Sequence, residues 1–201
     1  MVDKFDTADI NLTGLSSGSH TINVELVDNS GNALANPQTA SITFNVYTEA
    51  TLPGVESFDY TTGETLGEQD LWNNNFSGDD IMIESGSLSY STLNGQGNSI
   101  SFDGSGTDPS MYFTPVSSGK IYTSFMLKIT AFDASAVDGY FAVLRTDSGS
   151  YQSRLWISPQ SATTYKIGIS NGGTLTQTTA ATYNVDDIVF VVFNYDIDNN
   201  T

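Results

Sequence analysis

The chain has 201 residues, of which 23 are acidic and 6 are basic, and its formal net charge at pH 7 is −17. This excess of acids argues against a nucleic-acid partner, because phosphate backbones are held by clustered Lys and Arg. The lack of cysteine excludes disulfides, thiolate nucleophiles and zinc–thiolate sites, and no apolar run reaches the roughly 18 residues of a membrane span.

Residues 1–48 are predicted to hold three strands, in the segments DINLTGL, HTINVELVD and ASITFNVY. Apolar residues alternate in the second segment at Ile22 and Val24, and in the third at Ile42 and Phe44. The run LTGLSSGSHTINVELVDNSGN resembles the back half of an immunoglobulin-like or fibronectin type III-like domain, which has about seven strands. This resemblance implies that residues 1–48 are the C-terminal part of such a domain.

Residues 49–56 are predicted to form a linker broken by Pro53-Gly54, and residues 57–201 are predicted to form an all-β domain. No helical period of useful length occurs there, and about ten strands indicate a two-sheet jelly-roll sandwich. The long predicted strands are 120–130, 139–146, 151–158, 164–170 and 188–195. The last of them is apolar on both faces, so we expect it to lie centrally between sheets or under a loop, with at least one further strand beyond the C-terminal end.

The ordered series KIYTSFMLKIT, GYFAVLRT, SRLWISPQ and KIGIS resembles laminin G-like, concanavalin A-like modules of large secreted bacterial proteins. The resemblance implies a non-catalytic module with a concave sheet, a secreted or cell-surface location and neighbouring domains in the same polypeptide. It also implies calcium at the sandwich rim in some members. The opening residues, MVDKFDTADINL, lack the apolar core of a signal peptide, so we expect an export signal to lie upstream of Met1.

Enzymes on this fold are the main alternative, either a glycoside hydrolase or a polysaccharide lyase. The five long predicted strands contain no Asp or Glu, and the Glu-x-Asp-x-x-Glu signature of the hydrolases is absent from the chain. The lyases use a His with Tyr, Arg and Gln, and the single His of this chain, His20, falls in the first domain. We therefore expect no enzymatic activity.

A candidate ligand-binding surface follows from the two-residue period of the strands. Gln152, Arg154 and Trp156 share one predicted face, and the corresponding faces of two neighbouring strands carry Tyr122, Lys128 and Lys166. Flat rings can stack on sugar faces, and planar polar groups can bind hydroxyls or carboxylates, so this set favours an anionic polysaccharide. The alternative is that the bases protect exposed strands from edge pairing and that Trp156 belongs to the core.

A candidate structural calcium site lies in the acidic loops, because calcium binds six to eight oxygen ligands. The candidate ligands are Asp59, Asp79, Asp80, Asp196 and Asp198. The alternative is that these acids are turn residues and solvated surface. Taken together, the sequence predicts a non-catalytic, extracellular carbohydrate-binding or adhesion module, with a structural spacer domain as a further alternative.

Overall fold

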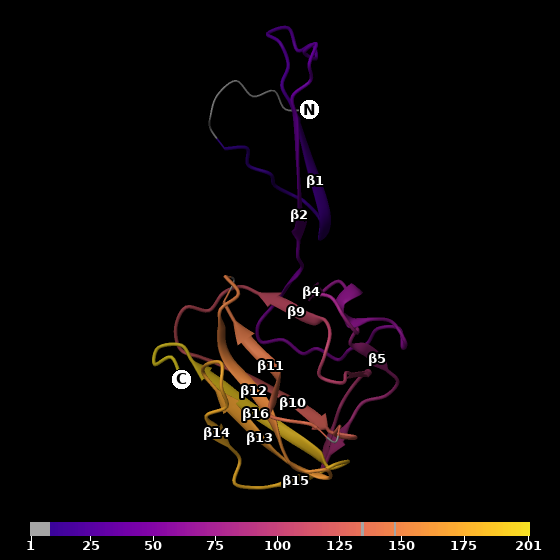
Figure 1. The fold of residues 1–201 in the computed structure, drawn as a ribbon, viewed down its shortest axis with the longest axis vertical. Helices are drawn as coiled ribbons and strands as arrows, with labels where there is room; N and C mark the ends of the chain where they lie inside the picture. Colours follow the sequence, from indigo (N-terminus) through magenta and orange to yellow (C-terminus); the bar gives the residue numbers. More distant parts are fainter. Residues whose placement is uncertain (1–8, 134, 147) are drawn as a thin grey trace. The chain divides into compact units, whose positions relative to one another are not determined.

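A computed structural model describes residues 9–133, 135–146 and 148–201 (Figure 1). The described chain is an all-β protein: its elements are strands, apart from one 3₁₀ turn, η1 (Leu66–Glu68). It divides into two compact units, Met1–Glu49 and Ala50–Thr201, with β3 (Glu49–Ala50) at the division. No helix of the described residues is long and apolar enough to cross a membrane.

The described residues of the first unit form one antiparallel pair of strands, β1 (Gly18–Glu25) and β2 (Thr39–Val46), in register from Gly18↔Val46 to Glu25↔Thr39. The strand predicted at 9–15 is wrong: this segment is irregular and pairs with no described strand. A strand needs a ladder partner to satisfy its backbone groups, and the alternation of apolar residues does not supply one. The resemblance to an immunoglobulin-like domain stays a prediction, since a single hairpin does not identify a domain type.

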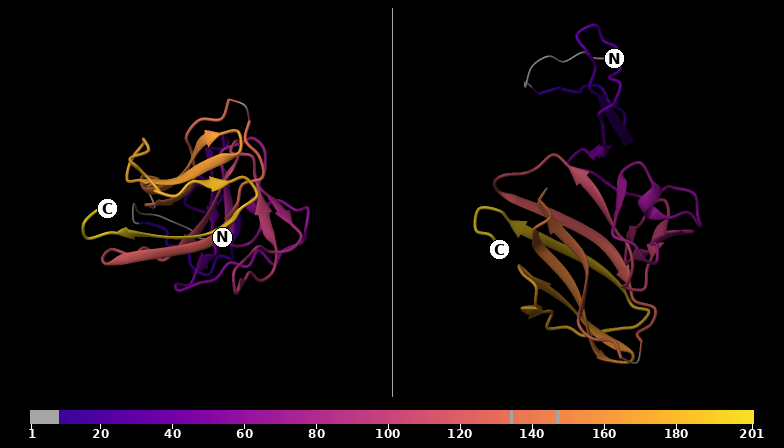
Figure 2. Two further views of the ribbon diagram at one scale, coloured as in Figure 1. Left: turned by 90° about the horizontal axis from the view of Figure 1, so that it is seen from below. Right: turned by 45° about the horizontal axis from the view of Figure 1, so that its top comes forward.

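The second unit is a sandwich of two layers, separated clearly in the left view of Figure 2. One layer is the antiparallel pair β10 (Lys120–Lys128) and β16 (Ile188–Asp196). The other follows the order β11-β12-β13-β14, with β15 also paired to β13. Its strands are β11 (Gly139–Arg145), β12 (Tyr151–Ser161), β13 (Thr164–Ser170), β14 (Gln177–Thr178) and β15 (Tyr183–Asn184).

Alternating apolar residues of both layers meet in a single core. One layer contributes Leu155, Tyr165 and Ile167, and the other contributes Val189, Val191 and Phe193. Phe125 links the layers, with its ring edge-on to Phe141 and Phe193 at 6.0 and 6.5 Å between centroids. This burial of apolar area is the main stabilising contribution of the sandwich.

Of the two positions predicted for residues 188–195, the central one is wrong, because β16 pairs with β10 and with no other described strand. The outer face of β16 is partly covered, since the ring of Phe190 stacks on that of Tyr90 with 6.3 Å between centroids. The odd-numbered residues of β16 face the core, while Phe190 and Val192 on its other face are 37% and 59% exposed. Apolar side chains on both faces therefore do not mark an interior strand here.

Short elements before β10 complete the unit. They are β4 (Trp72–Asn75), β5 (Met82–Glu84), β6 (Ser89–Tyr90), β7 (Leu93–Asn94), β8 (Ser99–Ser101) and β9 (Asp108–Phe113). The Glu56 carboxylate organises this region by accepting hydrogen bonds from Phe58 N, the Tyr60 hydroxyl and Trp72 Nε1, at 2.7, 2.9 and 3.1 Å. Trp72 also stacks on Phe58, with 6.1 Å between centroids, so it is a structural aromatic.

Candidate functional site

The outer face of the β11–β12–β13 sheet carries three of the six predicted ligand-binding residues. In the β12–β13 ladder, Arg154 lies opposite Ser170, Trp156 opposite Gly168, and Ser158 opposite Lys166. Paired residues share a face, and the neighbours Leu155 and Ile167 point into the core, so these pairs lie on the outer face. The alternation in the sequence thus placed Arg154, Trp156 and Lys166 on one surface, as predicted.

Gln152 does not share this surface, because β12 contains a register shift. The ladder with β11 passes from Leu144↔Ser153 to Arg145↔Tyr151, which leaves Gln152 as an extra residue. Such a bulge reverses the alternation beyond it. Gln152 Oε1 accordingly lies 2.9 Å from the hydroxyl of Tyr195, a buried residue of the other layer. Gln152 is therefore a residue between the layers, and its prediction as a surface ligand is corrected.

The same shift brings Tyr151 to the outer face beside Arg154. The guanidinium carbon of Arg154 lies 4.6 Å from the ring centroid of Tyr151 and 5.0 Å from that of Tyr140. Tyr140 and Tyr151 meet edge-on at 6.0 Å between centroids. Contacts between a guanidinium and an aromatic face contribute about 0.5–2 kcal/mol each, so they hold Arg154 in one orientation. We call Tyr140, Tyr151 and Arg154 the arginine–tyrosine cluster.

Arg154 has unused hydrogen-bonding capacity. Its Nε is buried, and no described residue accepts a hydrogen bond from it. The ion pairs formed within the described part of the chain are Lys120–Asp196 at 3.1 Å and Lys128–Asp186 at 3.6 Å, and neither involves Arg154. A buried donor normally has a partner, so the Nε of Arg154 is an exception to the usual pairing of buried polar groups.

Trp156 supports the cluster and does not serve as an exposed stacking residue. It is 6% exposed, and its Nε1 donates a hydrogen bond of 2.8 Å to Ser170 Oγ. Its ring meets Tyr140 edge-on, with 5.5 Å between centroids. A Cβ at Gly168 would overlap the Leu175 side chain, so the absence of a side chain there allows Leu175 to pack over the sheet next to Trp156. Tyr140, by contrast, is 42% exposed.

Sequence reasoning missed Tyr140 and Tyr151 as site residues. The sequence did show an aromatic residue near the start of each of two consecutive strands. It did not show that Tyr140 and Tyr151 lie on the same face of the sheet, because this depends on the register shift in β12. Burial raises the pKa of the Tyr140 hydroxyl, and the neighbouring Tyr151 and Asp108 add to the rise. Tyr140 consequently remains a neutral hydrogen-bonding group at physiological pH.

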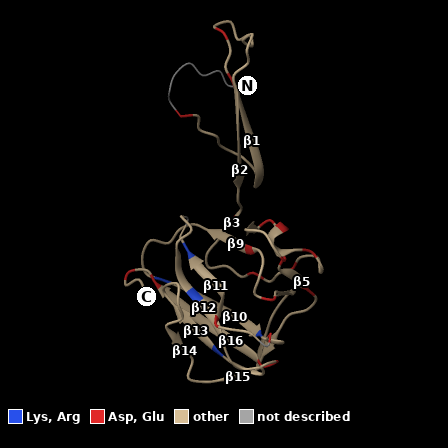
Figure 3. Ribbon diagram, in the orientation of Figure 1, with Lys and Arg blue, Asp and Glu red and all other residues tan. Residues whose placement is uncertain are grey.

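This sheet is basic in an otherwise acidic chain. Strands β11, β12 and β13 contain Arg145, Arg154 and Lys166 and no Asp or Glu, as Figure 3 shows. Arg145 lies opposite Tyr151 and so shares the outer face with the cluster. Three of the six basic residues of the chain therefore lie on one sheet face.

Tyr122 and Lys128 do not join this surface, because their strand, β10, belongs to the other layer. Phe125 and Leu127 of β10 pack on the core, so Tyr122 and Lys128 point away from it, on the opposite side of the sandwich. Tyr122 is 68% exposed, and Lys128 pairs with Asp186. The sequence showed which face of β10 is apolar but not which sheet β10 enters.

The predicted calcium ligands at the C-terminal end take part in a turn. Asp196 accepts hydrogen bonds from Asn199 N, Asn199 Nδ2 and Lys120 Nζ, at 3.1, 3.0 and 3.1 Å. Asp198 Oδ1 accepts from Gly119 N at 3.1 Å. The bonds from Asn199 and Lys120 hold the pKa of Asp196 below its usual range.

The other three candidate ligands, Asp59, Asp79 and Asp80, are exposed. Within residues 9–133, 135–146 and 148–201, no group of three or more His, Asp or Glu is arranged to hold a metal ion. The structural calcium site stays a prediction.

Comparisons with known proteins do not assign a function to this chain, so any functional proposal rests on the geometry of the site. No protein-family model matches the chain, no curated protein matches its sequence, and no solved structure matches its fold. The resemblance to laminin G-like modules accordingly stays a prediction.

Proposed function

We propose that the second unit is a non-catalytic carbohydrate-binding module of a secreted or cell-surface protein, and that it holds an anionic glycan on the outer face of the β11–β12–β13 sheet. The observation that carries this proposal is Arg154, a guanidinium held over two tyrosine rings without a carboxylate partner among the described residues. Arg145 and Lys166 on the same sheet likewise form no ion pair with a described acid.

The chemistry of the arginine–tyrosine cluster suits a uronate or sulfated sugar. A guanidinium binds carboxylate or sulfate oxygens through two parallel hydrogen bonds, which a lysine ammonium does not reproduce. The exposed ring of Tyr140 offers an apolar face for a sugar ring, and its neutral hydroxyl can bind a sugar hydroxyl. Arg145 and Lys166 provide positive charge along the same face for neighbouring residues of a polymer.

The net charge of −17 does not prevent such binding. At physiological ionic strength the screening length is about 8 Å, so charges in distant connections act weakly at this face. Asp108 of β9 is an acid close enough to affect Tyr140. A spacer domain is less well supported, because it does not account for an exposed tyrosine beside an unpaired arginine. An enzyme is also less well supported, because these strands carry no carboxylate.

The test is a titration of the 201-residue protein with polygalacturonate, followed by calorimetry, with dextran as a neutral control polymer. We expect polygalacturonate binding to weaken about 10- to 100-fold in Arg154→Ala and to be lost progressively as salt is raised. Lys128→Ala removes a base from the opposite layer and is the matched control, so it should bind as the wild type does.

Three results would contradict the proposal. Equal weakening by Arg154→Ala and Lys128→Ala would show that binding is a non-specific charge effect. Binding to no anionic or neutral polymer would favour the spacer. Release of new reducing ends by the isolated protein would favour the enzyme.

Structural calcium is a separate proposal for this unit. A rise in melting temperature on addition of calcium, reversed by EDTA, would support it, and an unchanged melting temperature would contradict it.

A further inference from the structure

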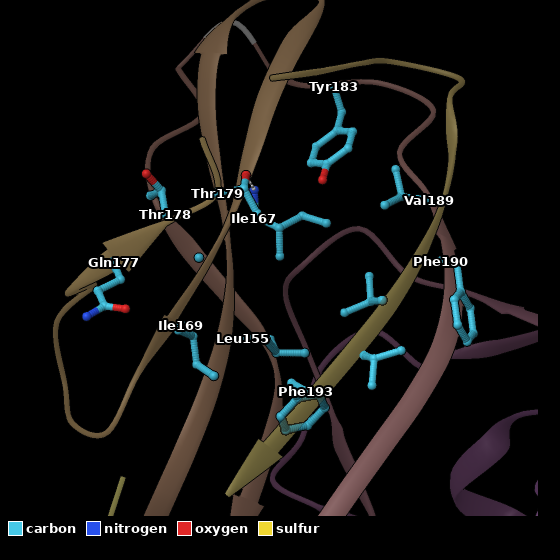
Figure 4. A pocket seen from close by; sticks show the side chains of 13 residues that line it. Leu155, Ile167, Ile169, Gln177, Thr178, Thr179, Tyr183, Val189, Phe190 and Phe193 are labelled. Carbon is cyan, nitrogen blue, oxygen red and sulfur yellow. Dashed lines mark hydrogen bonds between the residues drawn. The ribbon is translucent and has the colours of Figure 1, made fainter. Parts of the chain in front are cut away.

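The turn that follows β13, residues 171–174, lies beside the guanidinium of Arg154. Ile169 of β13 lines a cavity between the two layers of the second unit (Figure 4). Ser170 is the next residue along the strand, so it faces outward, where it is the ladder partner of Arg154. The turn therefore begins on the outer face of the sheet, next to the arginine–tyrosine cluster.

Hydrogen bonds on both sides hold this turn in place. Ser170 Oγ accepts from Trp156 Nε1 at 2.8 Å and donates to the carbonyl oxygen of Gly172 at 3.0 Å. Asn171 Nδ2 donates to Asn200 Oδ1 at 3.1 Å. The turn is thus attached to β12 through Trp156 and to the segment after β16 through Asn200.

One end of the Arg154 guanidinium is available to a ligand. Nε is buried, so the edge formed by Nε and Nη2 is not accessible. Nη1 and Nη2 form no ion pair with a described residue. A carboxylate can therefore bind to Arg154 end-on, with one oxygen at each of these two nitrogens.

A glycine leaves the space beside Nη1 open. A Cβ at Gly173 would lie 3.8 Å from Arg154 Nη1, and no other described atom beyond the adjacent residues would lie within 4 Å of it. A Cβ at the preceding residue, Gly172, would meet no described atom within 4 Å. Neither glycine has φ in the left-handed region, so a side chain at either position would not strain the backbone. A side chain in place of Gly173 would lie against Arg154, whereas one in place of Gly172 would not.

On the premise of the proposed function, we infer that the carboxylate of a bound uronate occupies the space beside Gly173 and accepts hydrogen bonds from Nη1 and Nη2 of Arg154. An Asp in place of Gly173 would compete for the same nitrogens, because its oxygens are only two bonds from Cβ. Gly173 therefore determines whether Arg154 is open to a ligand. Tyr140 is on β11, across β12 from the turn, so its exposed ring can contact the sugar while Arg154 holds the acid group.

The experiment supplies a competing acid from the protein itself. Gly173→Asp places a carboxylate beside Nη1, and Gly172→Asp adds the same charge one residue away, so it is the matched control. In calorimetric titrations of the complete 201-residue protein with polygalacturonate, we expect binding to weaken at least about tenfold in Gly173→Asp and less than about threefold in Gly172→Asp. Gly173→Ala, which brings only a methyl group to Nη1, should weaken binding by a smaller factor than Gly173→Asp. Thermal melts of the three variants should resemble that of the wild type, because none of the substitutions strains the backbone.

A second polymer tests the acid group of the ligand. Fully methyl-esterified polygalacturonate has the same sugar rings without free carboxylates, so it should not bind measurably. Equal weakening by Gly173→Asp and Gly172→Asp, or binding of the esterified polymer as tightly as the acid, would overturn the inference. Weakening by Arg154→Ala without weakening by Gly173→Asp would overturn it and leave the proposed function standing. Absence of polygalacturonate binding by the wild type would overturn both.

Discussion

Replacing Tyr195 by Phe tests the register shift on which the arginine–tyrosine cluster depends. Tyr195 is 7% exposed, and its hydroxyl lies 2.9 Å from Gln152 Oε1 and 2.6 Å from Asn200 Oδ1. Loss of the hydroxyl removes these contacts and leaves the amide of Gln152 between the layers with one partner fewer. A hydrogen bond of this kind contributes a net 0.5–1.5 kcal/mol or so, and an unsatisfied buried group costs about 1–3 kcal/mol.

We therefore expect Tyr195→Phe to lower the free energy of unfolding by about 1–3 kcal/mol. Urea denaturation measures this, and with a slope of roughly 2 kcal/mol per molar urea the midpoint should fall by about 0.5–1.5 M. Adding Gln152→Leu to Tyr195→Phe should restore about 1 kcal/mol, because two apolar groups then face each other.

The result that would refute this reasoning is a loss below about 0.5 kcal/mol in Tyr195→Phe, or strictly additive effects of the two substitutions. Either would mean that Gln152 points outward. Uninterrupted alternation would then hold along β12, and Tyr151 would not lie beside Arg154.

Three further predictions concern stability. Phe193→Ala should lower the free energy of unfolding, measured by urea denaturation, by about 3–5 kcal/mol. Val192→Ala, at a 59% exposed position, should change it by under about 0.5 kcal/mol. Equal effects of the two substitutions would contradict the assignment of these residues to opposite faces of β16. Burial raises the pKa of Tyr165 to about 12, so the folded state favours the neutral form of this hydroxyl. The contribution of neutral Tyr165 to the free energy of unfolding is therefore complete below pH 10 and is lost between pH 10 and 12. The hydroxyl of Tyr165 has no described hydrogen-bond partner, so Tyr165→Phe should leave the protein equally or more stable. Thermal melts of this variant should show a smaller loss of stability at alkaline pH. A destabilised variant would mean that the hydroxyl has a partner. The lowered pKa of Asp196 contributes stability above its usual value of 3.8 that is lost as pH falls, so Asp196→Asn should weaken the acid dependence, and an unchanged acid transition would contradict the hydrogen bonds from Asn199.

Much of the second unit could be predicted from local patterns. Strands β10 and β13 lie where period-2 alternation places them, and β16 lies on a continuous apolar run. Tyr165 and Ile167 face inward with Lys166 outward. These features depend on neighbouring residues of one segment, which is why the sequence suffices. The prediction at 9–15 failed for the complementary reason, since it required a partner strand that the described chain does not provide there.

The amino-acid sequence by itself determined an all-β chain, the inward face of β10, and the concentration of bases on strands that lack acids. Only the tertiary structure decided which strands share a layer, and it thereby separated Tyr122 and Lys128 from Arg154. It also decided that Gln152 turns inward and that Tyr151 takes its place beside Arg154. The physical reason is that sheet partners and bulges arise from pairing between segments, whereas alternation is a property of one segment alone.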